Sequence, residues 1–307
     1  MLSDKKSSCL VTGGAGFIGS NLVDRLILDG HRVVCVDNES AVSNEKFYWN
    51  EKAENHVVDI RDPECDKLFN GIDYVFHMAA ESRIQTAIED PENAVDVNCV
   101  GTCKVMQSAR KHGVKRVMYS STSAAYGLTE VCPQKENFPE DCLNPYSVSK
   151  VAGEKICKMY WDLFDVECII FRYFNVYGER SPVSGQYAPV LGIFLNQERD
   201  NKPLTVVGTG ENRRDFIHVY DIVEANVLAM EKDLSSEHIG EVYNVGFGEN
   251  HSINEIASMI SQNKIHISER PGEAKTTLCD YSKIKNALGW EPKIKVNEWI
   301  EQTMEKS

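Results

Sequence analysis

The sequence predicts an α/β protein, built as a doubly wound parallel sheet with a smaller, interleaved C-terminal lobe. Three observations carry this prediction. Short β-branched runs alternate with helical patterns in the first half of the chain, as in βαβ units. The runs are apolar without strict alternation, which is typical of strands covered on both faces. A cluster of glycines also stands between the first run and the first helical pattern.

The elements follow in order along the chain. Apolar runs predict strands at 9–12, 32–37, 56–60, 74–77, 116–121 and 167–172, and helical patterns lie at 17–28, 92–111 and 145–163. After Asn175, the turn formers of "NVYGERSPVSGQYAP" predict a loop. Beyond it we expect helices at 190–199, 219–230, 253–260 and 282–288, and strands at 204–207 and 242–245. Residues 1–174, with returns near 212–247, are expected to form the larger domain, and 175–211 with 248–307 the smaller lobe.

Charge and composition exclude several classes of partner. The chain has 307 residues with 33 basic and 46 acidic side chains, a formal net charge of −13. An acidic protein of this kind is not expected to bind nucleic acid or an anionic membrane. No apolar run reaches the ~18 residues of a membrane span. The ten cysteines show no metal-binding spacing, so no metal site is expected, and free thiols favour a cytoplasmic location.

The glycine-rich turn indicates a dinucleotide site of the Rossmann type. "CLVTGGAGFIGSNL" places Gly13, Gly14, Gly16 and Gly19 between the first strand and the first helix. Glycines let the turn tighten and let backbone amides approach a pyrophosphate at the helix N-terminus. Asp37, at the end of the second strand, can accept both ribose hydroxyls and would repel a 2′-phosphate. The sequence therefore favours NAD over NADP.

A tyrosine and a lysine indicate general-base chemistry. "NPYSVSKVAGEK" places Tyr146 and Lys150 on one face at the start of a helix. A phenol is a poor base at its ordinary pKa of ~10. A neighbouring ammonium and a positively charged nicotinamide would favour the phenolate and pull this pKa toward neutrality.

Together with the glycine turn, these motifs carry a resemblance. TGGAGFIG, VDN, VVDIRD, HMAAES, VNCVGT, SSTSAAYG, PYSVSK, RYFNVYG, RRDFIHV and RPGEAK run along nearly the whole chain. In this set the sequence resembles the extended short-chain dehydrogenase/reductases of the nucleotide-sugar epimerase/dehydratase family. The resemblance implies NAD as cofactor, a nucleotide sugar as substrate, and a homodimer joined by the helices at 92–111 and 145–163 in a four-helix bundle.

The resemblance also implies three sets of site residues. The catalytic residues would be Thr122, Tyr146 and Lys150. The cofactor-binding residues would be Gly13, Gly16, Phe17, Ile18, Gly19, Asp37, Asn38, Asp59, Ile60, Met78, Ala79, Ala80, Asn98, Ser120, Tyr146, Lys150 and Tyr173. The substrate-binding residues would be Ser82, Thr122, Asn175, Arg214, Arg270, Glu273 and Thr277.

Two positions bear on the reaction and the sugar. Members of this family that eliminate water carry Asp-Glu directly after the catalytic threonine, and the related decarboxylases carry Glu at the second of these positions. This chain has Ser123 and Ala124 there, which favours 4-epimerisation of a UDP-hexose such as UDP-glucose or UDP-galactose. The dehydratase-like HMAAES keeps a dehydratase, decarboxylase or reductase as alternatives, and a catalytically silent NAD-binding protein is a third hypothesis. By the same resemblance, Thr277 stands where a small residue leaves room for an N-acetyl group, as in UDP-N-acetylglucosamine.

Overall fold

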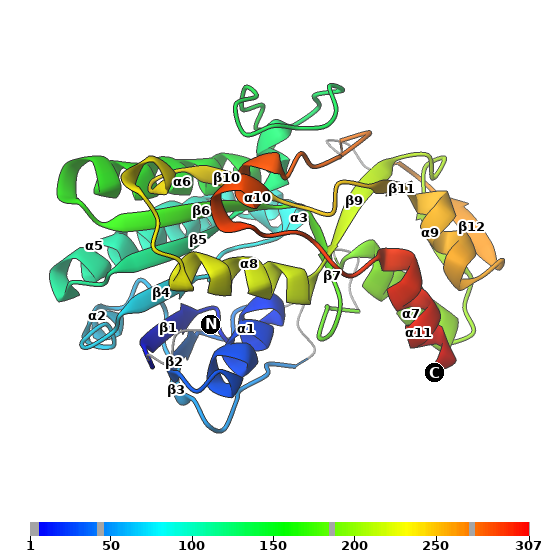
Figure 1. Ribbon diagram of the computed structural model, residues 1–307. Helices are drawn as coiled ribbons and strands as arrows, with labels where there is room; N and C mark the ends of the chain where they lie inside the picture. The colour runs from blue at the N-terminus through cyan, green and yellow to red at the C-terminus, as the bar shows by residue number, and fades with distance from the viewer. Residues whose placement is uncertain (1–5, 42–45, 184–187, 270–273, 307) are drawn as a thin grey trace.

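A seven-stranded parallel sheet forms the larger part of the molecule (Figure 1). The computed structural model describes residues 6–41, 46–183, 188–269 and 274–306. The strands stand in the order β10-β6-β5-β4-β1-β2-β3, and each neighbouring pair is parallel. Their bounds are β1 (Ser8–Thr12), β2 (Arg32–Asp37), β3 (Glu54–Val57), β4 (Tyr74–His77), β5 (Arg116–Thr122), β6 (Glu167–Tyr173) and β10 (Val242–Val245). The order reverses between β1 and β4, where a doubly wound sheet binds its ligand.

Helices cover both faces of this sheet, because its strands are apolar on both sides. One buried cluster includes side chains of α1 (Phe17–Leu28), α8 (Val219–Glu231) and α10 (Ser282–Leu288). The opposite cluster includes side chains of α2 (Pro63–Lys67), α5 (Thr102–His112) and α6 (Pro145–Phe164). The predicted doubly wound α/β fold is confirmed.

A smaller lobe carries two short sheets, on the right of Figure 1. One has the order β11-β9-β7, with β7 (Asn175–Tyr177), β9 (Arg213–His218) and β11 (Asn250–Ser252). The other pairs β8 (Leu204–Val207) with β12 (Lys264–Ile267). A third buried cluster joins them to α7 (Val190–Arg199), α9 (Ile253–Ile260) and α11 (Val296–Glu305). The smaller lobe thus has a hydrophobic core of its own.

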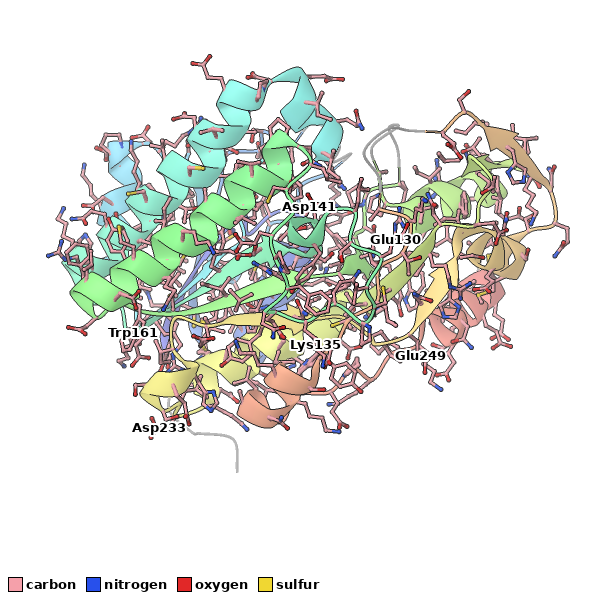
Figure 2. All side chains as sticks on the ribbon, turned by 90° about the horizontal axis from the view of Figure 1, so that it is seen from above. Glu130, Lys135, Asp141, Trp161, Asp233 and Glu249 are labelled. Atoms are coloured by element: carbon pink, nitrogen blue, oxygen red, sulfur yellow. The ribbon has the colours of Figure 1, made fainter. Side chains whose placement is uncertain are left out.

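The two parts are joined closely beside a cavity. β6 ends at Tyr173 and β7 begins at Asn175, so a single residue separates a strand of the large sheet from one of the small sheet. The segment that carries Glu130, Lys135 and Asp141 runs across the top of the molecule (Figure 2). Within it, the Gln134 amide donates to the Leu278 carbonyl at 2.7 Å.

Several elements differ from the prediction. The helix expected at 92–111 is three pieces, α4 (Pro91–Val95), a π-helical stretch η1 (Asp96–Gly101) and α5. The strand expected at 56–60 is Glu54–Val57, since the chain turns away from the sheet before Ile60. The loop expected from Asn175 begins with β7. Strands β9, β11 and β12 and helices α2, α3 (Ile84–Glu89) and α11 were not predicted, nor were the 3-10 turns η2 (Ser123–Tyr126) and η3 (Ser236–His238).

None of the helices in the described part of the chain combines the length and apolarity that a membrane crossing needs.

Candidate active site and cofactor cleft

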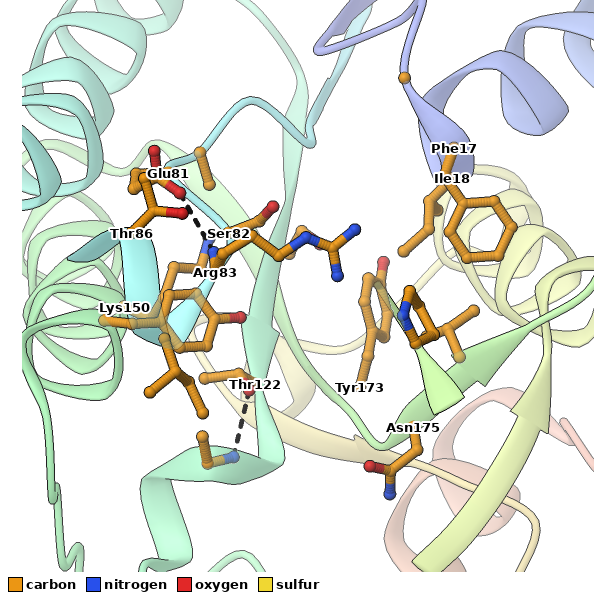
Figure 3. Close-up of a pocket in the computed structure, with 18 of the residues that line it drawn as sticks. Phe17, Ile18, Glu81, Ser82, Arg83, Thr86, Thr122, Lys150, Tyr173 and Asn175 are labelled. Carbon is orange, nitrogen blue, oxygen red and sulfur yellow. Dashed lines mark hydrogen bonds between the residues drawn. The ribbon is translucent and has the colours of Figure 1, made fainter. Parts of the chain in front are cut away.

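One cavity of about 690 Å³ brings together almost all the predicted site residues. It opens at the carboxyl ends of the large-sheet strands and continues to the sheet of β7 and β9 (Figure 3). Of the predicted residues that the structure describes, Asn98 alone does not line it. Arg270 and Glu273 lie outside the described residues. Each residue's role stays a prediction, but the common location agrees with one ligand-binding cleft.

The glycine turn has the shape that a dinucleotide requires. Gly13 has a positive φ of +66°, and a Cβ on it would lie 2.7 Å from the Ala79 amide nitrogen. A Cβ on Gly19 would lie 2.1 Å from the Gly13 carbonyl oxygen. Helix α1 begins after Gly16, which offers no side-chain cap, so the first N–H groups of the helix are left for a ligand. These residues fit the pyrophosphate of NAD.

Asp37 ends β2 at the rim of this cavity, as the ribose-binding prediction requires. Its two carboxylate oxygens accept hydrogen bonds from the Ala15 amide at 3.1 Å and the Glu39 amide at 2.8 Å. Burial raises the pKa of Asp37, and the backbone donors act against this rise. The amides hold the carboxylate in place and leave acceptor capacity for ribose hydroxyls.

Asp59 and Ile60 lie beside Asp37 and Asn38 on the cavity wall. The Asp59 carboxylate accepts hydrogen bonds from Arg61 at 2.7 Å and from the Asn38 side-chain amide at 2.7 Å. The bond from Arg61 is the main cause that lowers the pKa of Asp59 to about 2. This end of the cleft, which we predicted to hold the adenine, is therefore a fixed polar wall.

The catalytic candidates meet where β5 ends and α6 begins. Thr122 caps η2, and its hydroxyl oxygen accepts from the Ala124 amide at 3.1 Å. Asn144 and Ser147 form a capping box that starts α6, which places Tyr146 and Lys150 in its first turns. Figure 3 shows the Lys150 and Thr122 side chains along the same side of the cavity.

Burial controls the protonation of both candidates on α6. Lys150 is 3% exposed, and burial lowers its pKa from 10.5 to about 8. Burial also raises the pKa of Tyr146, and a hydrogen bond with Thr122 and the positive charge of Arg83 partly oppose this rise. We expected Lys150 to lower the Tyr146 pKa. Among the described residues Arg83 is instead the cation that does so, because the Lys150 ammonium lies over the Tyr119 ring, 4.5 Å from its centre.

Asn98 lies behind the cavity wall. It is 1% exposed, accepts from the Glu81 amide at 2.9 Å and donates to the Glu81 carbonyl at 2.9 Å. It also donates to the Ser149 hydroxyl on α6 at 2.9 Å. Asn98 thus ties the loop after β4 to α6, and we infer that any effect on a cofactor passes through this loop.

The predicted sugar-nucleotide residues gather on the small sheet. The Asn175 amide donates to the Asp215 carbonyl at 2.9 Å and to the Thr277 hydroxyl at 3.2 Å. Arg214 on β9 lines the cavity and donates to the Arg213 carbonyl at 3.0 Å. The buried Asp215 carboxylate accepts from three backbone amides, those of Phe247, Gly248 and Cys279.

Three features of the site were missed from the sequence. Glu154 and Arg172 form a buried ion pair of 2.7 Å behind β5. The Asn226 amide donates to the Tyr173 hydroxyl at 2.8 Å. Arg83 enters the cavity from the loop after β4 (Figure 3). No motif marked Asn226 or Arg83, and Arg172 stood inside RYFNVYG without an assigned role.

Comparison with known proteins agrees with the geometry. The NAD dependent epimerase/dehydratase family matches residues 9–246. A UDP-glucose 4-epimerase of Mycolicibacterium smegmatis is 33% identical over 309 residues, covering 96% of this chain and 97% of the relative. A crystal structure of Thermotoga maritima UDP-glucose 4-epimerase with UDP-glucose superposes with a TM-score of 0.90 at 33% identity, covering 97% of each chain. A UDP-N-acetylglucosamine 4-epimerase of Methanobrevibacter ruminantium M1 superposes with a TM-score of 0.90 at 30% identity, covering 98% of each chain.

The family match spans most of the chain, and its description confirms the predicted NAD cofactor. With the glycine turn, Asp37 and the residues at the start of α6 in one cavity, sequence and geometry agree. The chain belongs to the NAD dependent epimerase/dehydratase family.

Proposed function

We propose that this protein is an NAD-dependent 4-epimerase of a UDP-hexose. The observation that carries the proposal is the cavity wall after Thr122, where Ala124 presents a methyl group beside the three catalytic candidates. A methyl group cannot remove a proton from carbon 5 of a sugar. A 4-ketone formed at this place is therefore expected to be reduced again, and reduction from the other face inverts carbon 4.

The side chains supply the proton transfers. Tyr146 accepts the proton of the sugar 4-hydroxyl, and the Thr122 hydroxyl, which is hydrogen-bonded to Tyr146, holds the same oxygen. The positive charge of Arg83 and the hydrogen bond from Thr122 favour the phenolate form of Tyr146, and Lys150, whose pKa burial lowers to about 8, lines the same cavity. Bound NAD supplies the hydride acceptor and donor. Once the ketone has rotated, the proton on Tyr146 returns to the 4-oxygen.

The remaining assignments belong to the same proposal. The large sheet with α1 would hold NAD, and the small lobe with Asn175, Arg214 and Thr277 would hold the UDP-hexose. The free cysteines support a cytoplasmic location. The exposed apolar side chains of η1 and α6 support a homodimer through a four-helix bundle.

Glu81 supports a second candidate, a dehydratase. It lines the cavity that contains Thr122 and Tyr146 and is a carboxylate, the chemical type of base that Ala124 lacks. Its Oε1, however, accepts from the Arg83 amide at 3.2 Å within its own loop. This contact favours a structural role for the carboxylate.

Product analysis separates the two candidates. We expect wild-type protein incubated with UDP-glucose, UDP-N-acetylglucosamine and their 4-epimers to give only epimers by NMR, without added NAD. A 4-keto-6-deoxy product from wild type, lost in Glu81→Gln, would replace the epimerase proposal with the dehydratase. Ala124→Glu places a carboxylate on the cavity wall after Thr122, and its main effect should be a lower epimerase rate.

A further inference from the structure

We propose that Arg83 is a cofactor-binding residue, whose guanidinium binds the pyrophosphate of NAD from the side of the cavity opposite the glycine turn. The proposal concerns a residue outside the predicted cofactor set. It does not depend on which sugar the protein turns over, or on whether it turns one over.

The first observation is a partly buried cation whose Nε has no partner in the described part of the chain. The Nε of Arg83 is buried and has no hydrogen-bond partner among the described residues. Burying a guanidinium is costly unless an anion or acceptors compensate. The two buried arginines of the described chain, by contrast, have carboxylate partners, Arg116 with Glu167 at 2.7 Å and Arg172 with Glu154 at 2.7 Å.

The nearest carboxylate does not fill this role. Glu81 Oε1 accepts from the backbone amide of Arg83, and the Glu81 backbone is fixed at both its N–H and its carbonyl by Asn98. The guanidinium is therefore left to face the cavity. Burial lowers the pKa of Arg83, with Tyr146 and Glu81 acting against this, so its charge is not fully compensated by the chain.

The direction of the side chain points to the cofactor. Figure 3 shows the guanidinium of Arg83 extending into the cavity, toward Tyr173 and the wall that carries Phe17 and Ile18. Phe17 and Ile18 are the first residues of α1, whose free N–H groups face the expected pyrophosphate. A pyrophosphate between Arg83 and this helix start would have donors on two sides.

The other cations of the cavity are paired or lie on other elements. The glycine turn from Gly13 to Leu22 contains no lysine or arginine, so it offers only neutral donors. Besides Arg83, the described basic residues lining the cavity are Arg61, Lys150 and Arg214. Arg61 pairs with Asp59 and Asp96, Lys150 belongs to the catalytic helix, and Arg214 lies on the small sheet. Arg83 is thus the available charge for the pyrophosphate, and a guanidinium suits it because its planar fork can donate two bonds.

The test measures binding to protein from which NAD has been removed. Arg83→Gln removes the charge and the terminal fork but keeps a polar side chain, and Arg32→Gln is a matched control, because Arg32 pairs with Glu54 at the far end of β2. Losing a charge-assisted bond should weaken NAD binding by about tenfold or more in Arg83→Gln. Arg32→Gln should keep the wild-type dissociation constant, and adenosine, which lacks the pyrophosphate, should bind wild type and Arg83→Gln equally.

Three results would overturn the proposal that Arg83 binds the pyrophosphate. Arg83→Gln with wild-type NAD affinity overturns the proposal. So does a weakened affinity for UDP-glucose in NAD-saturated Arg83→Gln with unchanged NAD affinity, because this would assign the guanidinium to the sugar nucleotide. If Arg83→Gln does not fold, Arg83→Lys, which keeps the charge without the fork, should still bind NAD several-fold more weakly. Wild-type NAD affinity in Arg83→Lys would also overturn the proposal. Turnover is not a readout, so a failure of the epimerase proposal leaves the result interpretable.

Discussion

The side-chain amide of Asn175 lies 3.2 Å from the hydroxyl oxygen of Thr277, a residue 102 positions later in the chain. The same hydroxyl accepts from the Asp215 amide at 3.1 Å. Thr277 therefore joins the segment 274–280 to the first residue of β7 and to β9, and its small side chain lines the cavity. A larger side chain here must extend into the cavity or break this junction.

This relationship defines the prediction for N-acetylated sugars. We expect wild type to epimerise UDP-N-acetylglucosamine as well as UDP-glucose, because threonine leaves room beside carbon 2. Thr277→Tyr should abolish turnover of the acetylated sugar and keep that of UDP-glucose. Thr277→Ser keeps the acceptor oxygen and should retain both activities. Equal loss on both sugars in Thr277→Tyr, or a wild type inert toward the acetylated sugar, would remove Thr277 from the specificity argument.

Tyr146 is predicted to be the general base. Tyr146→Phe should lower kcat by about 100-fold or more, as the loss of a general base does, with folding and NAD binding nearly unchanged. Tyr160→Phe is the matched control on the same helix, since the Tyr160 hydroxyl contacts Gln107 at 3.1 Å, away from the cavity. Steady-state rates and NAD titration measure both variants. Substantial activity in Tyr146→Phe would refute the assignment.

Asp215 is predicted to make stability depend on pH. Burial raises its pKa to about 6 in the folded chain, above the ~3.9 of an unfolded aspartate. The folded state therefore binds more protons between these pH values. The contribution of Asp215 to the free energy of unfolding is present below pH ~4 and lost as the pH rises through about 6.

Thermal unfolding between pH 4 and pH 8 checks this sign. Asp215→Asn removes the titration. The Tm of wild type minus the Tm of the variant should therefore fall as the pH rises and become constant above about pH 7. A difference independent of pH would contradict the raised pKa.

The homodimer remains a prediction that solution measurements can decide. Val100 on η1 is 44% exposed and Met159 on α6 is 38% exposed, which is the apolar surface that a helical interface would bury. We expect a dimer by light scattering, and a monomer for Val100→Glu combined with Met159→Glu. Leu28→Glu, at the end of α1 and 83% exposed, should remain a dimer. A monomeric wild type would contradict the four-helix bundle.

The sequence predicted those parts of the fold and site that local patterns encode. Helices α1 and α7 begin and end at the predicted residues, because each has a clear apolar face. The start of β7 inside a turn-rich segment was missed, since three residues give no period, and its stability comes from pairing with β9. The π-helical stretch η1 was missed for a similar reason, because a one-residue widening does not change the apolar pattern.

In the candidate site, too, some residues could be predicted from local sequence patterns and others could not. Gly13, Asp37 and Tyr146 were predicted because backbone approach, ribose binding and proton transfer each require a particular residue type. Arg83 was not predicted, because the sequence does not distinguish an exposed arginine from a partly buried one that lines a cavity. The position of Arg83 on the cavity wall, with its Nε buried, depends on the fold around it.

The one-residue step between β6 and β7 has a mechanical consequence. Tyr173, which we predict to contact the cofactor, and Asn175, which we predict to contact the sugar nucleotide, are separated only by Phe174, whose amide donates to the Val245 carbonyl at 3.0 Å. The short connection and this hydrogen bond hold Tyr173 and Asn175 close together, so the two sheets meet at a fixed point of the cavity wall. In the proposed 4-epimerisation, the sugar has to present both faces of carbon 4 to one cofactor, and we expect the rotation to take place within the ligand and not at this connection.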